Sequence, residues 1–146
     1  MKERFETFTV LINRISRNIK KIENAEMKEY NLRSAHISCL FYLYTKKSLT
    51  STDLCESCEE DKATISRAIA FLEKEGYLIC ESKTEKRYKS PLILTEKGNE
   101  AGKKIADKIN RVLNEVGIGL DDKEREEFYR CLKIISENLD KIGSNF

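Results

Sequence analysis

The sequence has 146 residues, of which 40% are hydrophobic and 36% charged, a composition typical of one helix-rich domain rather than a disordered chain or a β-sandwich. The net charge of +2 is too small to indicate a nucleic-acid partner by itself, so the distribution of charge must decide. No apolar run approaches the roughly 18 residues that cross a bilayer, and the first residues do not form a signal peptide, so we expect a cytoplasmic protein without a membrane partner.

Narrow apolar stripes occur at both ends of the chain. Apolar residues spaced by three and four predict helices over about residues 1–30 and 120–146. Such narrow seams are typical of helical bundles, so we expect them to pack between two subunits; packing only against the chain's own domain is the alternative. The predicted dimerisation residues are Phe5, Phe8, Ile12, Ile15, Ile19, Leu132, Ile135, Leu139 and Ile142.

Two helices are predicted between about residues 32 and 58. Leu32–Tyr44 is apolar on most faces, which predicts a helix buried on several sides. Thr50 and Asp53 form a capping-box pattern, which predicts a short helix that ends near Cys58.

A further helix and a hairpin follow. Ile65, Ala68, Ile69 and Leu72 lie on one helical face, and Gly76 is placed to end that helix. The apolar runs 77–80 and 92–94 flank a charged stretch, which predicts a two-stranded hairpin. Thr95 then caps a helix that we expect to end near Gly117.

Two helices joined by a tight turn and followed by a hairpin form a winged helix-turn-helix, whose second helix enters the major groove of DNA. We therefore predict a mainly α fold with a small two-stranded wing. Residues 1–146 form one domain, with the DNA-binding part at about 50–95 and the dimerisation helices at the two ends.

The second helix carries DNA-binding side chains on the face opposite its apolar residues. Lys62, Thr64, Ser66 and Arg67 can bond phosphates and base edges near the helix N-terminus, where the helix dipole also favours phosphate. Arg67 is the best candidate for a base contact. The alternative is an ordinary solvated helix face.

The hairpin tip is the most basic part of the chain. Between Ser82 and Ser90 there are four basic residues and one acidic residue, so these nine residues carry a net charge of +3. The basic residues are Lys83, Lys86, Arg87 and Lys89. Such a tip can follow the DNA backbone or insert Arg87 into a minor groove. A charged loop that protects a sheet edge is the alternative.

Three segments together resemble the MarR family of transcription regulators: 61–67, 72–78 and 94–98, with the basic wing between the last two. The resemblance implies a homodimeric regulator, acting as a repressor, whose two winged lobes read a pseudo-palindromic operator in double-stranded DNA. It also implies a small-molecule effector bound between the dimer region and each lobe. Ala63 stands where many members have serine, and Lys86 stands where many have aspartate.

Five acidic residues crowd the first helix of the motif and its turn: Asp53, Glu56, Glu59, Glu60 and Asp61. Some must point away from phosphate. We therefore expect weaker non-specific DNA binding than the wing suggests, with a steep salt dependence.

Cysteine and histidine offer little for catalysis. Cys55 and Cys58 form a C-x-x-C, but the nearby glutamates are expected to raise the pKa of both thiols, and no second pair completes a zinc site. His36 is the only histidine, so no enzyme constellation can be assembled, and no metal or cofactor is expected. Two alternatives stay open: a metal- or thiol-responsive regulator that uses Cys55 and Cys58, and a protein-interaction module on the same scaffold.

Overall fold

The computed structural model describes residues 2–81 and 89–146, with side chains from Thr7 onward. Its contacts divide the chain into two compact units, residues 1–108 and 109–146, each of which is considered by itself. Among the residues described, no helix combines the length and apolar character that crossing a membrane requires.

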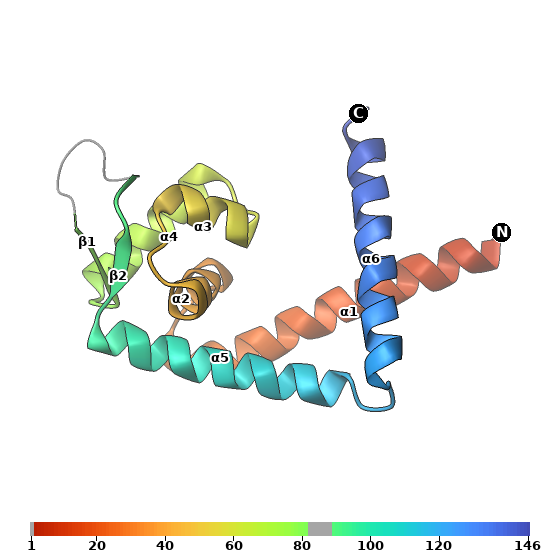
Figure 1. The fold of residues 1–146 in the computed structure, drawn as a ribbon, viewed down its shortest axis with the longest axis horizontal. Coiled ribbons are helices and arrows are strands. Elements are labelled where there is room, and N and C mark those ends of the chain that lie inside the picture. The colour runs from red at the N-terminus through yellow and green to blue at the C-terminus, as the bar shows by residue number, and fades with distance from the viewer. Residues whose placement is uncertain (1, 82–88) are drawn as a thin grey trace. The chain divides into compact units, whose positions relative to one another are not determined.

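The order of elements is that of a winged helix-turn-helix flanked by long helices (Figure 1). The elements are α1 (Lys2–Met27), the short 3-10 helix η1 (Lys28–Tyr30), α2 (Ser34–Lys46), α3 (Ser51–Cys58), α4 (Lys62–Lys74), β1 (Leu78–Cys80), β2 (Leu92–Leu94), α5 (Glu96–Val116) and α6 (Asp122–Gly143). The predicted mainly α fold with a two-stranded wing is confirmed. Only η1 was not anticipated among these elements.

Side-chain caps explain where three helices begin. Thr50 accepts a hydrogen bond from the Asp53 amide at 3.2 Å, and the Asp53 carboxylate accepts one from the Thr50 amide at 2.9 Å. Asp121 and Glu124 form the same reciprocal pair at α6, and Asp61 caps α4 by accepting a hydrogen bond from the Thr64 amide. Because these bonds satisfy amides that have no partner inside the helix, they fix the helix-turn-helix boundaries locally.

α2 lies at the centre of the first unit, where it packs against α1, α3, α4 and β2. The antiparallel strands pair Leu78 with Leu94 and Cys80 with Leu92, and the Leu92 amide also donates to the Leu49 carbonyl at 2.9 Å. The largest fully buried side chains are Leu40, Leu54, Ile65, Leu72, Leu78, Ile105 and Cys39. This core holds the two helices of the motif and the base of the wing together.

The start of α5 is locked to the end of α4 by one threonine. The Thr95 hydroxyl donates to the Gly76 carbonyl at 2.5 Å and accepts from the Gly98 amide at 3.1 Å, while its own amide donates to the Tyr77 carbonyl. Gly76 has a φ of +80°, a conformation that glycine adopts without strain. These contacts give the threonine and glycines of the 94–98 and 72–78 segments a structural role.

The second unit is almost entirely exposed. None of the described residues of α6 is buried, and Gly117, at the turn before it, lies against the Arg125 guanidinium. Phe128, Ile135, Leu139 and Ile142 are all more than a third exposed. The apolar side chains of α6 are therefore not buried within this unit.

Candidate nucleic-acid interface

α4 presents two chemically distinct faces. Ile65, Ala68 and Leu72 are buried in the core and hold the helix against α2 and α3. On the opposite side, three of the four predicted recognition residues, Lys62, Ser66 and Arg67, are exposed, and Thr64 is half-buried beside them. The predicted set therefore lies together on the N-terminal half of one helix, away from its buried face.

The N-terminal end of α4 brings an anion, Asp61, close to a cation, Arg67. The Asp61 carboxylate accepts a hydrogen bond from the Thr64 amide at 2.7 Å. The Thr64 hydroxyl oxygen lies 3.5 Å from Nη2 of Arg67. The hydrogen bonds from Thr64 lower the pKa of Asp61, and the Arg67 charge lowers it further, so this carboxylate is ionised at neutral pH. A charged cap thus occupies the helix end that would otherwise attract phosphate.

The acidic residues of α3 and its turn divide into structural and exposed ones. Asp53 is used in the capping box with Thr50, and hydrogen bonds from Thr50 lower the pKa of its carboxyl. Glu59 ends α3 in the left-handed region at a φ of 51°, and its amide donates to the Cys55 and Glu56 carbonyls. Glu56, Glu59 and Glu60 have exposed side chains. Two of the five carboxylates, Asp53 and Asp61, therefore serve as helix caps.

The wing begins and ends where the sequence predicts. Lys89, the last basic residue of the tip, is described and exposed. Lys83, Lys86 and Arg87 lie outside the described residues. Their role as backbone or minor-groove contacts stays a prediction from charge.

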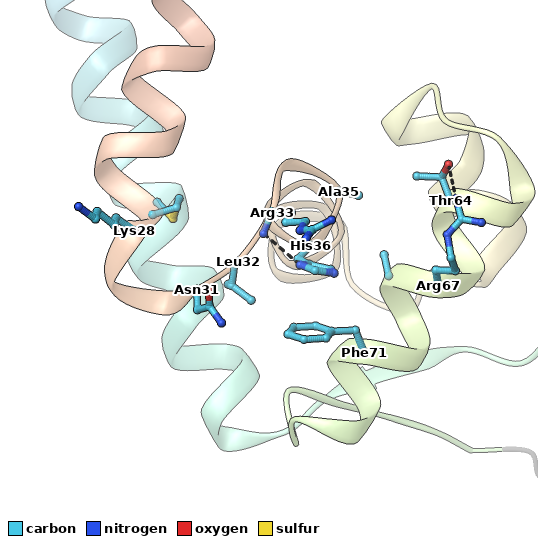
Figure 2. A pocket seen from close by; sticks show the side chains of 11 residues that line it. Lys28, Asn31, Leu32, Arg33, Ala35, His36, Thr64, Arg67 and Phe71 are labelled. Atoms are coloured by element: carbon cyan, nitrogen blue, oxygen red, sulfur yellow. Dashed lines mark hydrogen bonds between the residues drawn. The ribbon is translucent and has the colours of Figure 1, made fainter.

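A pocket of about 620 Å³ lies beside α4, lined by residues of α4 and of the segment that runs from the end of α1 to the start of α2 (Figure 2). The His36 ring stacks on Phe71 with centroids 4.2 Å apart, and its Nδ1 accepts the Arg33 amide at 3.0 Å. Arg33 and Arg67 both line the pocket, so the candidate base-reading residue also borders this cavity. The sequence offered His36 as a residue that either lines a ligand pocket or has a structural role, and here it lines the pocket. Its stacking on Phe71 was not predicted, because the two rings meet only through the packing of α2 on α4.

The same packing lowers the pKa of His36. Burial of the ring is the main cause, and the neighbouring Arg33 charge adds to it. A neutral ring fits its contacts, since Nδ1 accepts a hydrogen bond and cannot do so when protonated.

The thiols depart from the expectation that nearby carboxylates would raise both pKa values. The pKa of Cys55 is raised, by burial and then by Cys58. The pKa of Cys58 is instead lowered, because the Cys39 thiol donates a hydrogen bond to its sulfur and Lys46 lies near. The prediction was wrong for Cys58 because both neighbours come from α2. Within the described part of the chain, no three His, Cys, Asp or Glu side chains are grouped to hold a metal ion.

The described members of the predicted dimerisation stripes are exposed or half-buried in the single chain. Phe8, Ile12, Ile15 and Ile19 on α1 are between 39% and 51% exposed. On α6, Leu132 is half-buried and the others are exposed. The side chain of Phe5 lies outside those described.

No family model matches the chain, but individual proteins and solved structures are similar to it. The HTH-type transcriptional regulator BilQ of Clostridioides difficile is 23% identical over 133 residues, which cover 91% of this chain and 90% of that protein. The uncharacterized HTH-type transcriptional regulator YybA of Bacillus subtilis is 26% identical over 134 residues, covering 89% and 87%. Both relatives match across both units.

Solved structures match over nearly the whole chain. NMB1585, a MarR family regulator from Neisseria meningitidis, is 22% identical with a TM-score of 0.81, covering 98% of this chain and 99% of its own. A MarR transcriptional regulator from Methanosarcina mazei is 26% identical with a TM-score of 0.72, covering 94% and 92%. Staphylococcus aureus MepR, solved as a complex with DNA, is 18% identical with a TM-score of 0.79, covering 92% and 97%. The resemblance to the MarR family is confirmed, and the relatives are regulators rather than enzymes.

Proposed function

We propose that this chain, which has the winged helix-turn-helix fold of MarR family regulators, is a homodimeric transcription regulator and a repressor. In this proposal α4 enters the major groove of a pseudo-palindromic operator, and the wing contacts the flanking backbone or minor groove. The exposed face of α4 carries the proposal, because Lys62, Ser66 and Arg67 are held out by the buried opposite face. MepR, of the same fold, has been solved with DNA.

The exposed stripes on α1 and α6 support the dimer. In a single chain they would leave a large apolar area in water, at a cost of about 25 cal/mol for each Å². A second copy, with the same stripes, is the occupant that covers both at once. Two lobes held in this way would read two half-sites about one turn of DNA apart.

The test of DNA binding is fluorescence anisotropy with the DNA upstream of the protein's own gene, at low and at higher salt. Arg67→Glu should weaken binding at least about tenfold, since it removes a base contact and places a negative charge in the groove. Lys103→Glu is the matched control: Lys103 is an exposed cation on α5, where it pairs with Asp107, and the variant should retain most of the affinity. Equal losses in the two variants, or no binding by the wild type, would contradict the proposal.

We further propose that the pocket beside α4 binds a small-molecule effector with an apolar ring and an anionic group. Phe71, Leu32 and Met27 supply apolar lining, and Arg33 and Arg67 supply cations. An anion that pairs with Arg67 would compete with DNA for the same guanidinium, so the effector and DNA would weaken each other's binding.

Benzoate is a simple probe of this chemistry. It should raise the melting temperature of the full-length protein in proportion to its concentration and reduce DNA affinity. Arg33→Gln should remove most of the thermal shift without touching the exposed face of α4. An unchanged melting temperature at millimolar benzoate would exclude aromatic carboxylates as ligands of this pocket.

A further inference from the structure

A lysine on α5 joins the end of α1 to η1 within the first unit. The Lys108 ammonium donates a hydrogen bond to the Glu26 carbonyl at 2.7 Å and another to the Glu29 carboxylate at 3.1 Å. The Glu26 carboxylate lies 3.5 Å from the same nitrogen, and the centroid of the Tyr30 ring lies 5.7 Å from it. The two hydrogen bonds link positions 82 and 79 residues apart in sequence, so they depend on tertiary packing. We call these four residues the Lys108 cluster.

The end of α1 favours a cation. Carbonyl groups in the last turn of a helix have no partner inside the helix and carry the negative end of its dipole. α1 has no basic residue in its last turn, so Lys108 supplies from α5 the charge that α1 lacks. The hydrogen bond from Lys108 lowers the pKa of Glu29, so this carboxylate is ionised at neutral pH. Because the Lys108 side chain is only 24% exposed, salt screens its contacts less than those of a fully exposed pair.

The segment that the Lys108 cluster contacts is also a wall of the pocket beside α4. Met27, Lys28 and Asn31 line the pocket, whereas the residues of the cluster do not (Figure 2). Met27 is buried, but η1, which follows it, has no buried residue and is a single turn of 3-10 helix, whose hydrogen bonds are poorly aligned. The core therefore does not fix this wall beyond Met27, and the charged contacts from Lys108 do.

We propose that Lys108 is a positioning residue for the pocket, whose ammonium holds the wall at residues 27–31 in place, so that a ligand of the pocket binds weakly when this charge is removed. The ligand half of this proposal rests on the proposed effector pocket, whereas the fixing of the wall does not. Lys108 acts on the pocket through Glu26 and Glu29, without touching the ligand.

Two physical effects connect the charge to ligand binding. Without the ammonium, the carboxylates of Glu26 and Glu29 lose the cation that lies between them and the α1 carbonyl, and their mutual repulsion favours a displaced wall. The apparent affinity of a ligand then falls in proportion to the fraction of molecules whose wall is in the binding position. The change should stay local, because no residue of the Lys108 cluster belongs to the buried core.

The fixing of the wall is tested by hydrogen exchange on the full-length protein. Lys108→Met keeps much of the apolar side chain and removes the charge, so peptides that cover residues 24–31 should exchange at least about tenfold faster. Peptides from α3 should be unchanged. Lys108→Arg, which retains the charge, should exchange slowly like the wild type. Lys103→Met is the matched control, because Lys103 is an exposed lysine of the same helix that pairs only locally with Asp107.

Unchanged exchange over residues 24–31 would overturn the proposal. Equal acceleration throughout the first unit would do so as well, since it would show a general loss of stability in place of a released wall. Circular dichroism shows whether each variant is folded. If Lys108→Met is not, Glu29→Gln removes one charged partner and should give a smaller acceleration in the same peptides.

The effect on the pocket is tested by titration calorimetry with benzoate as the probe. Lys108→Met should bind benzoate at least about fivefold more weakly than the wild type, while Lys108→Arg and Lys103→Met should bind it like the wild type. Faster local exchange with unchanged benzoate affinity would refute the positioning role. If the wild type binds no benzoate, the proposed effector class fails and the ligand half fails with it, and hydrogen exchange still decides whether Lys108 fixes the wall.

Discussion

Asp61 shows how one side chain can serve the fold and oppose the proposed function. Its carboxylate caps α4 through the Thr64 amide, and the same bond keeps it ionised. In a DNA complex it would lie near the phosphates that the N-terminus of α4 would attract. The expectation that some acidic residues point away from phosphate does not extend to Asp61, because its cap fixes the carboxylate at the N-terminus of α4.

Asp61→Asn should keep the cap and strengthen DNA binding. Asparagine caps helices about as well as aspartate, so the fold should be retained while one negative charge is removed. At low salt we expect a gain in affinity of about two- to fivefold, which should fade as salt screens the charge. Anisotropy over a salt series measures both effects. Asp140→Asn, an exposed site on α6, should change affinity much less, and equal gains would show that only net charge matters.

His36 should make the protein less stable in mild acid. Its pKa lies below the ordinary 6.5 because the ring is buried against Phe71 near Arg33. As pH falls through 6.5, the unfolded chain binds a proton that the folded chain does not, so unfolding becomes more favourable; this loss is absent above pH 6.5. The urea concentration at the unfolding midpoint should therefore decrease as the pH is lowered from about 7.5 to about 5.5.

The matched variant is His36→Asn, whose amide oxygen can still accept from the Arg33 amide but does not titrate in this range. Its urea midpoint should depend less on pH than that of the wild type. Parallel pH profiles would assign the acid sensitivity to other groups.

At the scale of elements, the close packing of the start of α5 against Tyr77 and Leu94 depends on Gly98. A Cβ at this position would overlap the Tyr77 carbonyl oxygen and approach Leu94 Cδ2 to 3.1 Å. Gly98→Ala should lower the free energy of unfolding by about 1–3 kcal/mol, as overpacking usually does. Urea denaturation at a fixed protein concentration measures this loss. Gly143→Ala, where nothing lies within 4 Å, should change it by less than about 0.5 kcal/mol.

Elements with local signals were predictable from sequence. The caps at Thr50 and Thr95 and the end of α4 at Gly76 depend on residues within a few positions, and each lies where predicted. The resemblance implied a pocket, but the pairing of His36 with Phe71 in its lining was not predictable, because it brings together side chains of different helices. Periodicity places a residue on a face of its helix but does not identify the residue that faces it.

The environment of the recognition residues was predicted only in part. Periodicity placed Lys62, Ser66 and Arg67 opposite the apolar face of α4, and they are exposed there. It did not indicate that Arg67 also borders a pocket, because that depends on α2 and on the end of α1. The same side chain can therefore be correctly placed by sequence and still have an unforeseen second neighbour.

At the scale of the whole molecule, the proposed homodimer rests on the exposed apolar stripes of α1 and α6. None of the described residues of α6 is buried, and Leu139 and Ile142 are more than half exposed. An amphipathic helix gains most of its stability from burying its apolar face, so α6 should be stable only in an assembly. A homodimer satisfies this need in both copies through the same contacts.

If the proposed dimer forms through this stripe, Leu139→Glu should dissociate it and weaken DNA binding. Two charges, one from each copy, would have to enter an apolar seam, which costs far more than a surface substitution. Analytical ultracentrifugation should find dimers for the wild type and monomers for the variant, and anisotropy should find an affinity loss of at least about a hundredfold, because a monomer engages one half-site instead of two. Asn138→Glu adds the same charge at the adjacent exposed position and should remain dimeric. If Leu139→Glu stays dimeric with unchanged affinity, the α6 stripe is not the dimer interface, and the stripe on α1 must be tested by itself with Ile19→Glu.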